Sequence, residues 1–64
     1  MMKMAKELTI GDQLTGDLDG IVTDKFSTMD KDRNRCVALV LETSDGWRDA
    51  TLPIAALVAV KAPA

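Results

Sequence analysis

The sequence has no histidine, one cysteine and only two aromatic residues. The lack of histidine excludes His-dependent catalytic triads, His general bases and Cys/His zinc sites. Cys36 has no second cysteine with which to form an intrachain disulfide, and it lies in an apolar run, where free thiols pack as small hydrophobic groups. No base-activated nucleophile and no glycine-rich phosphate loop is present. We therefore expect a non-catalytic protein of the reducing cytoplasm, without cofactor or metal.

Aromatic side chains and positive charge are both scarce. Phe26 and Trp47 are the only aromatic residues, which argues against the base-stacking platforms of single-strand and RNA binders. Ten acidic residues outweigh eight basic ones, whereas proteins that bind the phosphate backbone are usually basic. No apolar run approaches the roughly 20 residues of a membrane span. Nucleic acid is thus a less favoured partner than protein, and a membrane is not expected.

The continuous apolar run at residues 36–41 predicts the central strand of a small sheet. The run is short, it contains Val37 and Val40, and polar turn-forming segments lie on both sides of it. A half-solvated strand would alternate apolar and polar residues, and this one does not alternate before Glu42. We expect this strand to be covered on both faces.

Turn signals divide the remaining chain into further short strands. Gly11-Asp12 leads into a first strand at residues 13–15, and a Gly- and Asp-rich loop at residues 16–20 precedes a second at 21–26. A polar loop is expected at residues 27–35. Asp45-Gly46 supplies the positive φ angles of a tight hairpin, so residues 47–52 form a fourth strand paired with the central one. Residues 1–6 and 62–64 are expected to be disordered, which leaves a single domain at 7–61.

The segment after Pro53 has two interpretations. In the first, residues 54–57 form one helical turn with proline at its first position, and residues 58–60 form a closing strand. In the second, one helix runs through residues 54–61. With the turn and closing strand, the fold class is all-β, a small five-stranded barrel with one short helical turn before the last strand. The core is predicted to consist mostly of Leu14, Ile21, Val37, Leu39, Leu41, Leu52, Ile54 and Leu57.

Three short motifs resemble known small barrels. Gly11-Asp12-Gln13-Leu14 and Gly20-Ile21-Val22 are similar to the Gly-Asp-x-Val and Gly-x-Val motifs of SH3-like barrels of the KOW type and of plasmid-encoded type II dihydrofolate reductases. The segment at residues 53–57 resembles the Pro-Val-Ala-Ala-Leu segment of those reductases. The family's Val-Gln-Ile-Tyr active-site stretch corresponds here to Asp49-Ala50-Thr51-Leu52, which has neither the Gln nor the Tyr. The resemblance implies an SH3-like barrel that assembles with copies of itself, and no reductase activity.

Candidate binding residues fall into two groups. Basic residues cluster in and beside the polar loop, and Trp47 and Arg48 follow the hairpin turn. At that position an aromatic ring can either cap the core or anchor an interface, and we favour the core. The candidates are Lys25, Lys31, Arg33, Arg35, Trp47 and Arg48.

Two acidic patterns are assigned to turns. Asp30-x-Asp32-x-Asn34 has the oxygen spacing that opens a calcium loop, but Arg35 replaces the required glycine and Leu41 the required glutamate. Asp17 and Asp19 are expected to form a turn.

A binding module that contacts protein or assembles with itself is the predicted function. The alternative is a nucleic-acid-binding module that uses the basic loop at residues 25–35. A chain of 64 residues buries only about 60% of its unfolded surface. Its apolar segments at 36–41 and 52–60 hold more side chains than one small barrel encloses, so we predict a homo-oligomer, a dimer or tetramer.

Overall fold

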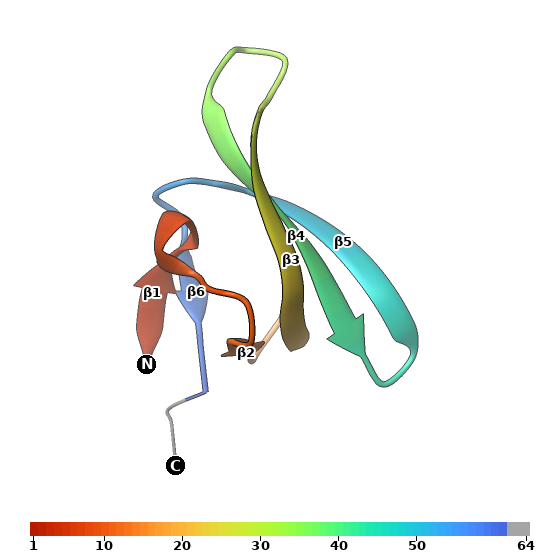
Figure 1. Cartoon of the computed structure of the whole chain (residues 1–64). Coiled ribbons are helices and arrows are strands. Elements are labelled where there is room, and N and C mark those ends of the chain that lie inside the picture. Colours follow the sequence, from red (N-terminus) through yellow and green to blue (C-terminus); the bar gives the residue numbers. More distant parts are fainter. Residues whose placement is uncertain (62–64) are drawn as a thin grey trace.

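The computed structural model describes residues 1–61, which form six strands and one 3₁₀ turn (Figure 1). The strands are β1 (Met2–Met4), β2 (Gln13–Leu14), β3 (Gly20–Met29), β4 (Arg35–Thr43), β5 (Gly46–Pro53) and β6 (Leu57–Ala59), and the 3₁₀ turn η1 (Ala5–Glu7) follows β1. No helix in residues 1–61 is long and apolar enough to cross a membrane. The predicted all-β fold class is confirmed.

Two antiparallel sheets face each other across the core. Strands β2-β3-β4-β5 form a curled four-stranded sheet, and β1 pairs with β6 in a two-stranded ribbon (Figure 1). The ribbon joins the larger sheet between β6 and β2, where Leu14 bridges Val60 and the Thr15 amide donates to the Ala59 carbonyl at 3.0 Å. The result is a barrel-like enclosure that stays open between β1 and β5.

The central strand was predicted correctly, and it is longer than expected. Strand β4 lies between β3 and β5 and buries Val37, Leu39 and Leu41. The polar loop predicted at residues 27–35 is only five residues long, because β3 continues to Met29 and β4 begins at Arg35. Ser27 and Thr28 near the end of β3 carry the ladder further, since polar side chains are tolerated where a hairpin extends into solvent.

The β4–β5 turn lies where Ser44-Asp45-Gly46 predicts it, but its backbone differs from the expected form. At this turn Gly46 alone has a positive φ, +113°. Ser44 and Asp45 do not, since Arg33 is the only non-glycine residue with a positive φ among residues 1–61. Thr43 pairs with Gly46, and the Thr43 hydroxyl bonds to the Asp45 amide and the Gly46 carbonyl, at 3.1 and 2.9 Å. A turn with αR-type central residues followed by a left-handed glycine is the other common short hairpin connection.

The segment after Pro53 follows the first of its two interpretations. A single turn is closed by the Ala56 amide, which donates to the Pro53 carbonyl at 3.0 Å, and strand β6 begins at Leu57. A helix through residues 54–61 is therefore excluded. Val58 and Val60 point into the core, which agrees with the preference of β-branched residues for strands.

The N-terminal segment differs most from the prediction of a disordered end. Met2–Met4 pairs with Leu57–Ala59, and the amides of Ala5 and Lys6 donate to the carbonyls of Ala56 and Ile54, at 2.8 and 3.0 Å. Ala5 is fully buried. Strand β1 raises the strand number from the predicted five to six, while the predicted disordered end at 62–64 lies outside the described residues.

The core contains half of the residues that were predicted for it. Leu14, Val37, Leu39 and Leu41 are buried, and Leu52 and Ile54 pack against them while partly exposed. Ile21 and Leu57 are instead 42% and 66% exposed, since their neighbours Val22 and Val58 take the inward positions. The unpredicted members of the core are Ala5, Leu8, Val22, Val58 and Val60.

Candidate binding surfaces

A β-bulge at Thr23 determines which residues of β3 face the core. Val22 pairs with Leu41 and Asp24 pairs with Val40, so Thr23 has no partner residue on β4. The Thr23 hydroxyl fills the gap by donating to the Val40 carbonyl at 3.1 Å. An extra residue inverts the alternation of the side chains that follow it. Beyond the bulge, Lys25 therefore turns to the concave side of the sheet and Phe26 to the convex side.

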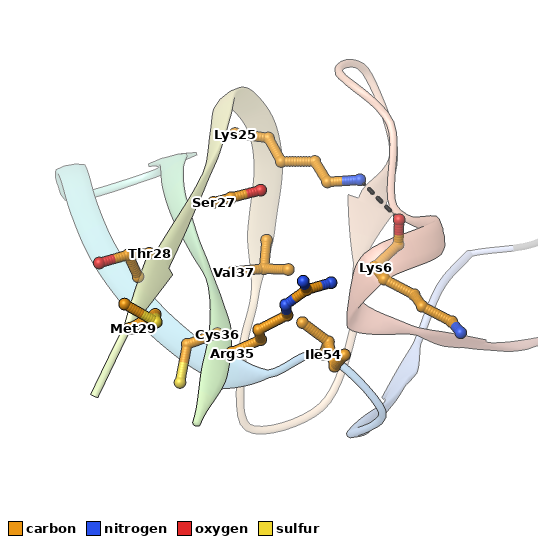
Figure 2. Close-up of a pocket in the computed structure, with 9 residues that line it drawn as sticks. All are labelled: Lys6, Lys25, Ser27, Thr28, Met29, Arg35, Cys36, Val37 and Ile54. Atoms are coloured by element: carbon orange, nitrogen blue, oxygen red, sulfur yellow. Dashed lines mark hydrogen bonds between the residues drawn. The ribbon is translucent and has the colours of Figure 1, made fainter. Parts of the chain in front are cut away.

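Lys25 spans the opening between the curled sheet and the N-terminal segment. Its partner on β4 is Leu39, a buried residue of the concave side. The Lys25 ammonium donates to the carbonyl oxygen of Lys6 at 2.8 Å (Figure 2) and also to the carbonyl oxygen of Leu8. Both carbonyls lie at the C-terminal end of η1, in Lys6 and in the capping residue Leu8, where the helical ladder provides no donor for them. Lys25 thus ties β3 to η1 while its charge remains at the mouth of a pocket.

This pocket lies against the β3–β4 hairpin, beside η1 (Figure 2). Its volume is about 560 Å³. The Arg35 guanidinium, from the first residue of β4, reaches into the same space between Val37 and Ile54, whereas the ammonium of Lys6 points away (Figure 2). The lining residues are Lys6, Lys25, Ser27, Thr28, Met29, Arg35, Cys36, Val37 and Ile54.

The pocket carries positive charge without a compensating carboxylate. None of its lining residues is acidic, and the ion pair found within residues 1–61 joins Lys3 to Asp12, outside the pocket, at 3.2 Å. The floor is apolar, because Val37 is buried and Ile54 packs against the core. Such a pocket offers cationic donors above an apolar surface, although the whole chain has a net charge of −2.

The convex side of β3-β4-β5 forms a second surface, which we call the outer face. Strand register places four cross-strand rows on it, namely Ile21-Glu42-Trp47, Asp24-Val40-Asp49, Phe26-Ala38-Thr51 and Thr28-Cys36-Pro53. Phe26 is 53% exposed and Trp47 is 69% exposed, so both aromatic residues of the chain lie in solvent on this face. The favoured prediction that Trp47 caps the core is wrong, because its strand partner Glu42 belongs to the convex side.

The structure separates the predicted binding residues into three places. Lys25 and Arg35 line the pocket. Lys31 and Arg33 are exposed in the loop at the tip of the β3–β4 hairpin. Trp47 and Arg48 lie next to the β4–β5 turn, which is at the opposite end of β4 (Figure 1). The basic residues and the aromatic residue therefore do not share one surface.

The tip loop is organised by Asp30. The Asp30 carboxylate accepts the backbone amides of Asp32 and Asn34, at 2.8 and 2.9 Å, and the Asn34 side-chain amide at 3.3 Å. The Asn34 amide and the other donors favour the charged form, so the pKa of Asp30 lies below its ordinary value. Residues 1–61 contain no group of three or more acidic, Cys or His side chains that could hold a metal ion. Asp30 serves the loop backbone, as expected for a turn.

The predicted facing of β3 was wrong before Thr23, because Val22 and not Ile21 lies in the core. An unbroken strand would place Phe26 on the same side as Val22, in the core. The signal that marks the bulge is weak, since aspartate is depleted in strands but a single one does not specify a bulge. If Phe26 faced the core, Lys25, Ser27 and Met29 would face solvent. The composition of these three residues allows either arrangement.

Comparison with known proteins gives no assignment. No protein-family model, no curated protein and no solved structure matches the chain.

Proposed function

We propose that the protein is a non-catalytic binding module that contacts protein through the free edge of β5, and that its partner is a second copy of the chain. The observation that carries the proposal is the exposure of Trp47 on β5, whose outer edge is unpaired. In a chain with only two aromatic residues, burial of either ring would stabilise the monomer, because aromatic side chains bury the most apolar area. Rings left outside are typical interface anchors.

Charge decides how two copies meet. The outer face carries Asp24, Glu42 and Asp49 around its apolar residues, and register places no basic side chain in its four rows. Stacking this face on its own copy would bring like charges together, which is destabilising. The edge of β5 is the better contact, since within residues 1–61 this strand has β4 on one side and no strand on the other. An unpaired edge is a ready template for another strand.

The sequence of β5 favours one register for two antiparallel copies. The Ile54 amide donates to the Arg35 carbonyl on β4, so the alternating residues 47, 49, 51 and 53 direct their backbone groups to the free edge. A register that pairs Asp49 with itself opposes two carboxylates. Shifting by one step pairs Ala50 with itself, Asp49 with Thr51, and Trp47 with Pro53. Pro53, which has no amide to donate, then stands at the end of the ladder, where proline is tolerated.

The test is the mass of the particle in solution, by light scattering and sedimentation velocity. We expect twice the 6.9 kDa chain mass at high concentration and dissociation on dilution, because an edge contact buries less area than a stable interface. Thr51→Pro removes a backbone donor that faces the free edge and should give a monomer. Thr51→Val keeps that donor and should remain a dimer.

Two further variants separate an edge contact from a face contact. Trp47→Ser should weaken the dimer, while Ile10→Ser, which removes a similarly exposed apolar side chain away from β5, should not. Phe26 lies two strands from the edge, so Phe26→Ser should leave the dimer intact. A dimer that survives Thr51→Pro but not Phe26→Ser would refute the edge contact, and a monomer at every concentration would refute self-association.

The alternative of nucleic-acid binding has less support. Lys25 is engaged by backbone carbonyls, and no exposed aromatic ring accompanies Lys31 and Arg33 at the tip of the hairpin. Retention on DNA or RNA at low salt, lost steeply at moderate salt, would favour this alternative over ours.

The finer fold assignment and the compartment are part of the proposal. The order of the strands, the β3–β4 hairpin and the single turn before β6 support an SH3-like barrel. Cys36 is a buried free thiol, which supports a reducing cytoplasm.

A further inference from the structure

We infer that the pocket between the β3–β4 hairpin and η1 binds a small organic anion, in which a carboxylate or phosphate head group is attached to an apolar body. This inference is independent of the proposed self-association, because β5 contributes none of the residues that line the pocket.

The head-group site is formed by Arg35 and Lys25. The Arg35 guanidinium reaches into the pocket, and no carboxylate in residues 1–61 lies within ion-pair distance of it (Figure 2). A guanidinium presents paired N–H donors that match the two oxygens of a carboxylate or phosphate. Lys25 is held in place by two carbonyl oxygens, and its ammonium has three donors, so one of them is left for a ligand. A fixed lysine beside a free arginine is a suitable arrangement for one anionic group.

The apolar body has its own contact surface. Val37 and Ile54 form the floor, and the Met29 side chain, 63% exposed, stands at the rim. The volume of about 560 Å³ falls within the roughly 300–1,000 Å³ that is usual for ligand pockets lined by apolar side chains and a few polar groups. Inorganic phosphate alone would leave most of this volume and all of the apolar floor uncovered.

The bulge at Thr23 is what makes the pocket cationic. Without the extra residue, Lys25 would lie on the convex side and Phe26 would occupy the concave one. The structural role of Lys25, which is to satisfy the carbonyls behind η1, explains one of the two charges. It does not explain Arg35, whose side chain could extend from the hairpin into solvent and instead reaches over Val37 (Figure 2).

The experiment is a titration of the protein with 1-naphthoate and, separately, 1-naphthyl phosphate, followed by methyl NMR signals of Val37 and Ile54. We expect saturable shifts of both residues with at least one of the two anions, and the tighter one identifies the head group. Acetate and inorganic phosphate test the charge alone, and 1-naphthalenemethanol tests the apolar body alone. Each of these three should bind at least about tenfold more weakly, because each lacks one of the two contact surfaces.

Variants at exposed positions locate the site. Arg35→Gln should weaken binding by about tenfold, and Arg35→Lys, which keeps the charge, should recover part of the loss. Lys31→Gln removes an equally basic residue from the tip of the same hairpin and should change the affinity by less than about twofold. The Thr51→Pro variant should bind the anions as the parent chain does, whatever its oligomeric state.

Three results would overturn the inference. The first is equal affinity of Arg35→Gln and the parent chain. The second is equal affinity for 1-naphthalenemethanol and the anions, which would show an apolar cleft without a head-group site. The third is the absence of saturable shifts at Val37 and Ile54, or shifts confined to Phe26 and Trp47 on the outer face.

Discussion

Replacing Gly20 with alanine should destabilise the protein far more than the same change at the other glycines. Gly20 begins β3 with a φ of +148°, and a Cβ there would lie 2.9 Å from the Glu42 carbonyl oxygen and 3.2 Å from the Leu41 Cβ. The oxygen belongs to the backbone of β4, so it cannot move aside without disturbing the β3–β4 ladder. Both the backbone conformation and the close approach of two strands require glycine at this position.

The two contributions can be estimated separately. A non-glycine residue in a strained backbone region costs about 1–3 kcal/mol. Forcing an extra carbon into a packed site costs about 1–3 kcal/mol more. For a domain of this length the whole free energy of unfolding is only about 3–10 kcal/mol, from roughly 0.05–0.15 kcal/mol per residue. We therefore expect Gly20→Ala to remove about half of the stability.

Urea unfolding followed by far-UV circular dichroism measures the loss. Gly16→Ala is the matched control, since Gly16 also has a positive φ, +85°, but an added Cβ would meet no atom within 4 Å. The control should lose only the backbone contribution, about 1–2 kcal/mol. Equal losses for the two variants would show that the close approach of β3 to β4 has no energetic weight, and the reasoning would be refuted.

Three other predictions concern the core, the buried thiol and the N-terminal turn. Val22→Ala should lower the free energy of unfolding by about 1–3 kcal/mol and Ile21→Ala by less than about 1, because Val22 is fully buried and Ile21 is not; equal losses in urea would contradict the inverted facing. Cys36 is 6% exposed, so it should react with a thiol reagent only as fast as the protein opens. If Cys36 reacted as fast as a free thiol in urea well below the unfolding midpoint, its burial would be contradicted. The backbone amide of Thr9, and then Lys3, lower the pKa of Asp12 below its ordinary 3.8, so the contribution of Asp12 to stability is complete above pH 3.8 and is lost as the pH falls below it. Asp12→Asn should therefore make the stability fall less steeply at acid pH, and an unchanged acid limb of the stability curve would contradict this.

Local signals in the sequence were sufficient for the strands of the larger sheet. The apolar run of β4, the Asp-Gly turn and the proline at the end of β5 each act within a few residues, and each appears where its local chemistry predicts. Strand β1 was missed for the opposite reason. Met2–Met4 has no strand pattern of its own, and it is ordered by pairing with Leu57–Ala59, which lies more than fifty residues away in the sequence.

The candidate site was predictable only in part. Composition identified Lys25 and Arg35 as members of a basic cluster, and both line the pocket. Their joint orientation depends on Thr23, where the bulge adds one residue to β3. A shift of one residue leaves composition and turn signals unchanged while it reverses every later side chain. For the same reason the exposure of Phe26 could not be deduced from its position in an alternating strand.

The pairing of β1 with β6 also sets an order of events during synthesis. The β3–β4–β5 meander joins neighbouring segments, so it can form as soon as its hairpins leave the ribosome. Strand β1 and the apolar residues Ala5 and Leu8 behind it are made first, and they must wait for residues 57–59 before they are covered. During that interval the nascent chain exposes them to chaperones and to other chains. Slow codons shortly before residue 57 would lengthen this exposure, whereas the same codons before residue 20 would not.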